Sequence, residues 1–285
     1  MYTEQTFQVQ REWSEEALLL LRKLLPLMAP VATAACWTDE ERETLGHLLS
    51  ASARSSESAL LLCVYGQLWD CEILVRSVLE GTLKYVYILQ SQSKSQERFF
   101  EYSRELWEIG LLKDHEKAST LLEALQNPNS IDWKPIYDML LSSEELTLFR
   151  DRYPKPRRRE LDRKWGFTGI INELTNSKDP ILSNFKALAH GYSIASHVAH
   201  ADCAGTSIAL ERDMRSSARR EAIHLAHLSR LISDIFTYFE MRLFIGYRFI
   251  NHSIAPIGEA AKAIEELMTR KKEIYESWIS KEYTR

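Results

Sequence analysis

The chain has 285 residues, 45% of them hydrophobic, which is enough to build a sizeable core in one large domain. Its formal net charge of -4 excludes a polycation, so any nucleic-acid contact has to come from a local basic patch. Only 10 glycines and 8 prolines supply turns, which disfavours a fold of many short strands and favours long helices.

The N-terminal region and the cysteines predict a soluble, cytoplasmic protein. Residues 1–16 lack the basic start and apolar run of a signal peptide, and the longest uncharged apolar run, 59–69, is too short to span a bilayer. No pair of cysteines has Cys-x-x-Cys spacing, and all lie in apolar stretches. We therefore expect reduced, buried thiols at Cys36, Cys63, Cys71 and Cys203.

Helical periodicity dominates the first part of the chain. Apolar residues at helix-face spacing predict a helix over 12–30. Thr38 and Glu41 have the spacing of a capping box, which predicts a helix starting there and running through the fifties. The most apolar stretch, 56–90, predicts one or two central helices, and 95–112 predicts another amphipathic helix.

Residues 113–178 are less regular and predict a helical insertion or lid-like region. Their short helical pieces are interrupted by Asn-Pro-Asn at 127–129 and Pro-Lys-Pro at 154–156. Regular helices are predicted again at 180–201, 214–250 and 257–281, and no strand pattern competes with them. We therefore predict an all-α fold: a single domain over 1–285, a multi-helix bundle that contains the insertion.

Three histidines lie close together on the helix predicted at 180–201. At 100° per residue, His190, His197 and His200 form one polar stripe on an otherwise apolar, Ala-rich helix. Buried polar groups need hydrogen-bond partners, so the stripe is either a structural seam or a functional cluster. His197 and His200 have the spacing of metal ligands, but Asp202 is expected to point elsewhere, and we predict neither a metal nor another cofactor.

A second polar stripe lies on the apolar helix predicted within 56–90. Glu72, Arg76, Glu80 and Lys84 follow one another at intervals of four residues with alternating charge. This pattern is typical of a solvated helix face. The rest of the segment is almost wholly apolar, however, which favours a central helix whose charged stripe faces a groove. Both interpretations stay open.

Arginine and histidine recur at short spacing in three places. The intervals resemble the Arg-x4–6-His motif of ribonucleases of the HEPN (higher eukaryote and prokaryote nucleotide-binding) superfamily. Pairs with this spacing also arise by chance in a chain of this composition. They are Arg42 with His47, Arg219 with His224, and Arg220 with His227.

A basic stretch at 153–165 is a candidate phosphate-binding strip. Arg157, Arg158 and Arg159 supply the charge, and Tyr153 and Trp165 at its ends are available for stacking on bases. The alternative is a solvated, charged loop that precedes the next helix.

Two segments carry a resemblance to known proteins. The run from Trp69 to Glu80, followed by aromatic residues, and the run from Tyr192 to His200 look like a widespread bacterial family of uncharacterised helical proteins. That family has an Arg-x-x-x-Glu helix and a Ser-x-x-x-His segment. The resemblance implies functional roles for Arg76, Glu80, Ser196 and His200.

The architecture of such proteins is similar to HEPN-type bundles, including abortive-infection proteins of phage defence. That similarity implies a homodimer, because HEPN enzymes usually complete their site across two chains. Here Arg76 and His200 lie on two different helices, whereas the HEPN ribonuclease motif lies on one, which puts an inherited mechanism in doubt.

The two polar stripes lead to a functional hypothesis in which their helices pack side by side. Arg76 would bind a phosphate, Glu80 would hold Arg76 or a histidine in place, and His200 would be the acid–base group. The reaction would be metal-independent cleavage of RNA by its ribose 2′-OH, in an effector of phage defence or a toxin system. Catalytic roles are assigned to Arg76, Glu80, Ser196, His197 and His200, and substrate contacts to His190, Tyr192, Arg157, Arg158 and Arg159.

The competing hypothesis is a non-enzymatic binding or regulatory subunit of a defence system. Its polar stripes would be structural, and the aromatic-rich segment 232–250 would be either a partner surface or part of the core. The partners expected under the two hypotheses are RNA or a nucleotide, a second copy of the chain, and a defence-system protein. No membrane is expected.

Overall fold

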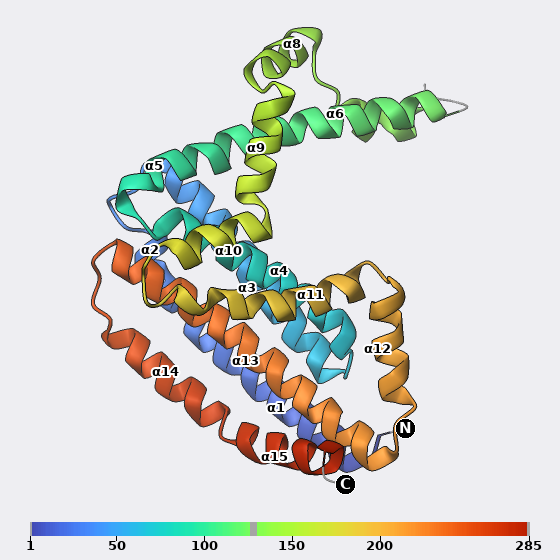
Figure 1. Ribbon diagram of the computed structural model, residues 1–285. Coiled ribbons are helices and arrows are strands. Elements are labelled where there is room, and N and C mark those ends of the chain that lie inside the picture. The colour runs from blue at the N-terminus through green and yellow to red at the C-terminus, as the bar shows by residue number, and fades with distance from the viewer. Residues whose placement is uncertain (1, 126–129, 284–285) are drawn as a thin grey trace. The chain divides into compact units, whose positions relative to one another are not determined.

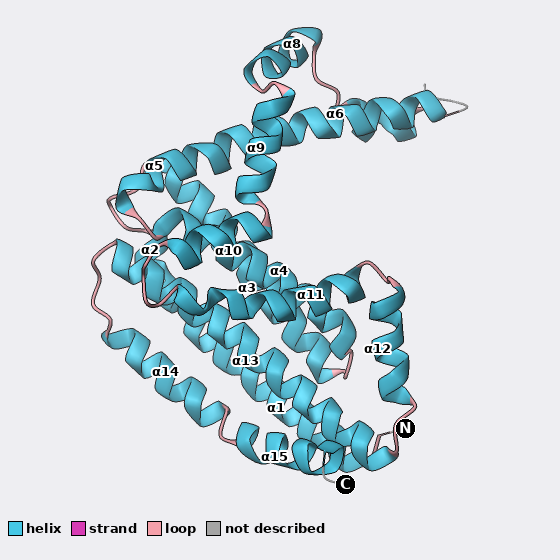
Figure 2. Cartoon of the chain, viewed as in Figure 1, coloured by secondary structure: helices cyan, strands magenta, loops and turns pink. Residues whose placement is uncertain are grey.

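The computed structural model describes residues 2–125 and 130–283, and every regular element in these ranges is a helix (Figures 1 and 2). The all-α prediction is confirmed. The chain divides into two compact units: unit 1 is Met1–Ser91 with Ile171–Arg285, and unit 2 is Gln92–Ile170. The expected insertion at 113–178 lies mostly in unit 2, and the Asn-Pro-Asn break at 127–129 lies outside the described residues.

Unit 1 is built from long helices around a shared core. α3, α4, α13 and α1 pack against one another, and α13 also packs against α15. Its elements are α1 (Glu4–Leu24), η1 (Leu25–Met28), α2 (Ala29–Ala32), α3 (Asp39–Val64), α4 (Leu68–Leu89), η4 (Ser183–Ala187), α11 (Leu188–Ala199), α12 (Cys203–Asp213), α13 (Ser217–Phe249), α14 (Ala255–Leu267) and α15 (Arg270–Tyr283).

The boundaries of α3 and α4 follow from local chemistry. Thr38 accepts a hydrogen bond from the Glu41 backbone, and the Glu41 side chain accepts one from the Thr38 backbone, which confirms the predicted capping box. α3 and α4 are separated by Gly66, whose φ of 75° lies in the left-handed region that favours glycine. Most of α4 is buried, in agreement with the central helices predicted within 56–90.

Two predicted helices after residue 180 are shorter than expected. The segment 180–201 forms η4 and α11, and a separate helix, α12, follows before α13. The segment 257–281 is divided between α14 and α15. Most of 232–250 lies within α13 and is largely buried, so core packing of this aromatic-rich segment is confirmed.

Unit 2 is a helical unit in which a row of carboxylates holds the basic helix α9 (Lys155–Trp165). Its other elements are α5 (Gln92–Phe100), the π-helical turn η2 (Glu101–Glu105), α6 (Leu106–Ala124), η3 (Ile131–Trp133), α7 (Lys134–Tyr137), α8 (Ser143–Arg152) and the start of α10 (Phe167–Asn176), which continues into unit 1 after Ile170. The charged-loop alternative for 153–165 is wrong, because Pro154 is the N-cap residue of α9 and the chain after it is helical.

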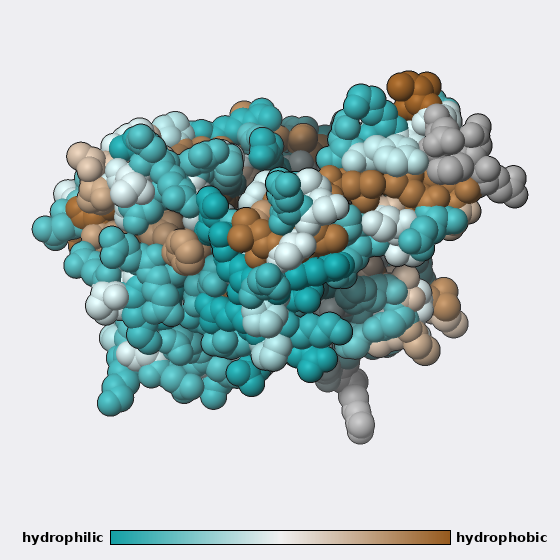
Figure 3. Space-filling view, turned by 90° about the horizontal axis from the view of Figure 1, so that it is seen from above, coloured by the Kyte–Doolittle hydropathy of each residue, from teal (hydrophilic) through white to brown (hydrophobic). Residues whose placement is uncertain are grey.

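The surface is mainly hydrophilic on the face seen in Figure 3, with separate apolar patches. The exposed apolar residues of unit 2 include Phe100, Trp107, Ile131 and Leu148. In the described ranges, no helix combines the length and the apolar character that crossing a membrane requires.

The cysteine prediction is half correct. Cys63 and Cys71 are buried, with their Sγ atoms 3.2 Å apart across the α3–α4 turn. Cys36 and Cys203 are exposed, because Cys36 lies in the turn between α2 and α3 and Cys203 is the first residue of α12. The apolar residues around them in the sequence belong to turns and helix ends.

Candidate functional site

The helices that carry the two predicted polar stripes, α4 and α11, pack side by side in unit 1, as expected. Arg76 of α4 joins them. Its Nε donates to Glu80 Oε1 at 3.0 Å, and its Nη2 donates to the Tyr192 hydroxyl at 2.9 Å. The Arg76 guanidinium carbon also lies 4.5 Å from the centre of the Tyr192 ring. Three of the predicted site residues are thus in direct contact.

One turn before Arg76, Glu72 forms a second, more deeply buried set of contacts. Its side chain is only 2% exposed. Glu72 Oε1 accepts from His227 Nε2 of α13 at 2.7 Å and also from Arg230 Nη2. Arg230 donates in turn to Asp234 at 2.9 Å. A buried carboxylate needs such donors, because an unpaired buried charge is strongly destabilising.

The contacts continue from His227 to α12. Arg212 Nη1 lies 2.9 Å from His227 Nδ1, and the Arg212 guanidinium carbon lies 4.4 Å from the centre of the Trp69 ring. Because arginine can only donate, Nδ1 is the acceptor and Nε2 carries the proton given to Glu72. Burial and the charge of Arg212 lower the pKa of His227 to about 3, so its imidazole is neutral.

A small cleft lies where α4, α11 and α13 meet. Its lining includes Arg76 and Glu72 from α4, Tyr192 from α11, and Arg230 and Asp234 from α13. Its free volume is about 10 Å³, which is room for about one water molecule. The Arg76 and Arg230 side chains are 18% and 39% exposed, so both guanidinium groups reach the rim.

The histidines of α11 lie apart from these contacts. His190 and His200 are exposed, and His200 is the C-cap residue of α11. His197 is partly exposed, and its Nδ1 lies 2.6 Å from Asp202 Oδ2. The expectation that Asp202 points away is wrong: α11 ends at Ala199, and the chain turns at Ala201, with φ of 47°, which brings Asp202 back to His197.

The remaining predicted site residues are placed as follows. Ser196 lies on α11 one turn after Tyr192 and is partly buried. Arg157 of α9 pairs with Glu105, Glu101 and Glu160, all within unit 2. Arg158 lies 3.9 Å from Glu116, and Arg159 is exposed. The three arginines belong to unit 2, whereas α4 and α11 belong to unit 1.

For the Arg–His pairs of the sequence, the structure places other partners beside the arginines Arg42 and Arg219 and beside the histidines His224 and His227. Arg42 binds Asp39, and Arg219 binds Glu282. His224 Nε2 lies 2.7 Å from Gln10 Oε1 of α1. The arginine that contacts His227 is Arg212, which the spacing motif does not include.

Sequence reasoning missed most of the buried network around Glu72. The sequence of α13 does carry a signal for this network. Arg230 lies three residues after His227, and Asp234 lies four residues after Arg230, so the three share one helix face. The same spacing links Glu72 with Arg76 on α4. No local signal identifies the contacts of Arg212 with Trp69 and His227, because they arise only when α12 folds back on α13.

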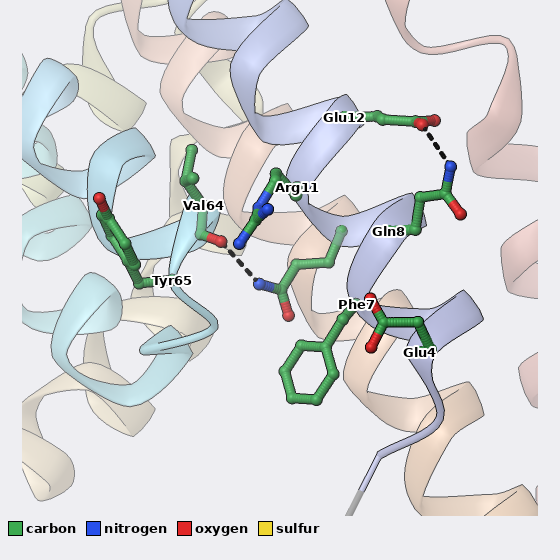
Figure 4. A pocket seen from close by; sticks show the side chains of 8 residues that line it. Glu4, Phe7, Gln8, Arg11, Glu12, Val64 and Tyr65 are labelled. Carbon is green, nitrogen blue, oxygen red and sulfur yellow. Dashed lines mark hydrogen bonds between the residues drawn. The ribbon is translucent and has the colours of Figure 1, made fainter.

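A second, larger pocket lies between α1 and the end of α3 (Figure 4). Its volume is about 510 Å³, and Phe7 and Tyr65 are the aromatic residues of its lining. Two hydrogen bonds join polar groups of its lining: Gln8 donates to Glu12, and Gln10 donates to the Val64 carbonyl. Among the described residues, no group of three or more His, Cys, Asp or Glu side chains is arranged to hold a metal ion.

Comparison with known proteins identifies a family but no activity. A model described as a family of unknown function, DUF5677, matches residues 42–217, which include α4, α11 and α12. No curated protein and no solved structure matches the chain. Because the match covers more than half of the 285 residues, the chain belongs to the DUF5677 family.

Proposed function

We propose that this protein binds a phosphate group of RNA or of a nucleotide at the rim of the cleft between α4, α11 and α13, and that it cleaves RNA without a metal ion. The observation that carries the proposal is the position of Arg76. It is held by Glu80 and Tyr192 at the mouth of a cleft that Arg230 also lines. Two guanidinium groups at one opening suit a phosphate, which they can bind through paired N–H donors.

Phosphate binding here would require an exchange of partners. The cleft has room for about one water molecule, and both arginines are paired with carboxylates. The ligand would therefore bind at the rim, with Arg76 and Arg230 turning outward. Glu80 is 36% exposed and Asp234 is 29% exposed, so both could be hydrated when their arginines leave.

The acid–base role in the proposal belongs to the histidines of α11. His227 does not suit it, because both of its ring nitrogens are engaged by Glu72 and Arg212. His197 is held through Nδ1 by Asp202, which leaves Nε2 as the reactive nitrogen, the arrangement that orients a catalytic base. His200 lies eight residues beyond Tyr192, about 12 Å along the helix axis.

The proposed reaction is a transfer within the RNA strand. The histidine takes the proton of the ribose 2′-OH, the 2′-oxygen bonds to the neighbouring phosphorus, and the bond from phosphorus to the 5′-oxygen breaks. The leaving 5′-oxygen takes a proton from water. Arg76 would stabilise the charge that develops on the phosphate oxygens.

The test is expression of the wild type beside Arg76→Ala, His197→Ala and His200→Ala, with growth and total RNA followed together. We expect slow growth and RNA fragments with the wild type, and loss of both with Arg76→Ala and at least one histidine variant at equal expression. His252→Ala, which changes an exposed histidine after the end of α13, is the matched control and should behave as the wild type. Intact RNA in every strain would contradict the proposal.

The pairing of the charges favours one competing function, a non-enzymatic binding or regulatory subunit. Among the described contacts of the cleft, Arg76 and Arg230 both form ion pairs with carboxylates of the same chain. Such pairs are typical of a network that fixes helix packing. Under this function, the Arg76 and histidine variants would change thermal stability or the capture of a partner protein, with no RNA fragments in any strain.

A further inference from the structure

The ring of Tyr2 lies against α13, at the end of the network opposite to the cleft. Its centre lies 4.3 Å from that of the His224 imidazole, and the two planes are tilted by 37°. The Arg220 guanidinium carbon lies 5.7 Å from the same ring. A planar ring in contact with an imidazole and a guanidinium is placed as a stacked base would be.

The chain that carries Tyr2 is tied to α13 by one residue, Glu221. The backbone N–H of Thr3 donates to Glu221 Oε1 at 2.9 Å. The hydroxyls of Thr3 and Thr6 donate to Glu221 Oε2 at 3.2 and 3.1 Å. These three hydrogen bonds hold Tyr2 over His224.

The residues beside Tyr2 include a cation without an ion pair. Within the part of the chain that the structure describes, Arg212 contacts His227 and Trp69 and no carboxylate. Burial, the largest effect, and the charge of Arg215 lower the pKa of Arg212 to about 10, whereas Tyr2 and Glu211 act in the opposite direction. Burial also lowers the pKa of His224 to about 4, so both histidines are neutral. Arg212 and Arg220 are the cations near Tyr2, Glu221 and Asp213 are the nearby carboxylates, and Arg220 donates to the Asp213 backbone carbonyl at 3.1 Å.

Neutral rings alternating with guanidinium groups suit a ligand with an aromatic ring and a negative charge. We propose that Arg212, Arg220, His224 and Trp69 form a binding site for a nucleotide unit, either free or at the end of an RNA strand, and that Tyr2 occupies the place of its base. The base would stack on His224 when Tyr2 leaves, and the phosphate would bind Arg212 and Arg220. The choice of a nucleotide rests on the proposed function, whereas the blockage by Tyr2 rests on the contacts described above.

The test measures binding of 5′-AMP and of a short single-stranded RNA by calorimetry to the full chain. Tyr2→Ala removes the internal occupant, and Glu221→Ala releases the segment that carries it. We expect each variant to bind at least one probe about five-fold or more tighter than the wild type, the equivalent of one stacked base. Tighter binding of AMP alone would indicate a free nucleotide, and tighter binding of RNA alone would indicate a strand end.

Tyr65→Ala, which changes an exposed tyrosine in the α3–α4 turn, is the control and should bind as the wild type does. Adding Arg212→Met to Tyr2→Ala should abolish the gain, with circular dichroism confirming that the double variant is folded. Equal affinities for wild type, Tyr2→Ala and Glu221→Ala would overturn the inference. That result would leave the proposed function intact if Arg76→Ala still abolished RNA cleavage, so the two failures are distinguishable.

Discussion

At the scale of single residues, the buried histidines make stability depend on pH. The pKa of His224 is lowered to about 4 and that of His227 to about 3, mainly by burial, from an ordinary value of about 6.5. Below pH 6.5 the unfolded chain binds protons that the native chain does not. The free energy of unfolding therefore falls as pH falls, by about 2 kcal/mol for each histidine between pH 7 and pH 5.

Urea unfolding at pH 7, 6 and 5 checks this expectation. His224→Gln should lose about half of the pH dependence, because glutamine keeps a polar contact with Gln10 but does not titrate. His47→Gln, on the surface of α3, should leave the pH dependence unchanged. An unchanged slope in His224→Gln would show that the buried imidazole is not the group that responds.

The cysteines should react in two classes. Cys36 and Cys203 are exposed, whereas Cys63 and Cys71 have no exposed surface. The hydrogen bond with the Cys63 thiol, together with burial, raises the pKa of Cys71. A maleimide should therefore label Cys36 and Cys203 in the native protein and all four cysteines in urea, as read by peptide mass spectrometry. Rapid native labelling of Cys63 or Cys71 would contradict the burial of that pair.

Loss of a buried partner should cost more stability than loss of an exposed side chain. His227→Ala removes one donor from the buried Glu72 and should lower the free energy of unfolding by about 1–3 kcal/mol. His200→Ala changes an exposed helix cap and should stay within about 0.5 kcal/mol of the wild type. Chemical denaturation measures both, and equal losses would mean that the Glu72–His227 contact contributes little.

At this scale, the sequence led to some contacts and missed others. Arg76 and Glu80 could be identified because they lie on a polar stripe of an apolar helix, and Tyr192 because it opens the segment that resembles a known family; the three are in contact. Trp69 and Arg212 could not, because their contact depends on the turn at Ala201 and on the path of α12. Whether any of these residues is catalytic stays a prediction.

At the scale of secondary-structure elements, the α11–α12 turn depends on Gly205. A Cβ atom at this residue would lie 2.2 Å from the carbonyl oxygen of His197, a backbone atom that cannot move aside without displacing α11. Gly205→Ala should therefore lower the melting temperature and separate His197 from Asp202. Gly191→Ala is the matched control on α11, because a Cβ there meets nothing within 4 Å.

The control should be neutral or stabilising by about 0.5–1 kcal/mol, since alanine favours helix more than glycine does. Thermal unfolding followed by circular dichroism compares the two variants. Equal melting temperatures would contradict the close approach of the helices.

The locations of the helices could be predicted from the sequence more accurately than the residues at which they begin and end. The Thr38 capping box and the apolar runs of α3, α4 and α13 carry their own signals. The basic segment of α9 has no apolar stripe typical of a helix, and it is held instead by the carboxylates of η2 and α6. These ion pairs are tertiary contacts that the local sequence does not show. The local sequence pattern therefore favoured a loop at 153–165.

At the scale of the whole molecule, the all-α class follows from few turn residues and dominant helical periodicity. The division into two units was not predicted, because unit 2 begins at Gln92, in the short interval between two stretches, 56–90 and 95–112, that both predict helices. The DUF5677 match spans parts of both units, and α13, which supplies His227, Arg230 and Asp234, begins where that match ends. The two partners of Glu72 on α13 thus lie outside the matched segment.

The central claim is that the arginines at the cleft bind a phosphate of RNA. Fluorescence anisotropy of a labelled single-stranded RNA, titrated with wild type, Arg76→Met, Arg230→Met and Arg54→Met, tests it most directly. We expect salt-dependent binding by the wild type and by Arg54→Met, whose arginine is exposed on α3, and affinities about ten-fold lower or weaker still for Arg76→Met and Arg230→Met. No binding by the wild type, or equal binding by all four proteins, would contradict a phosphate site between α4 and α13.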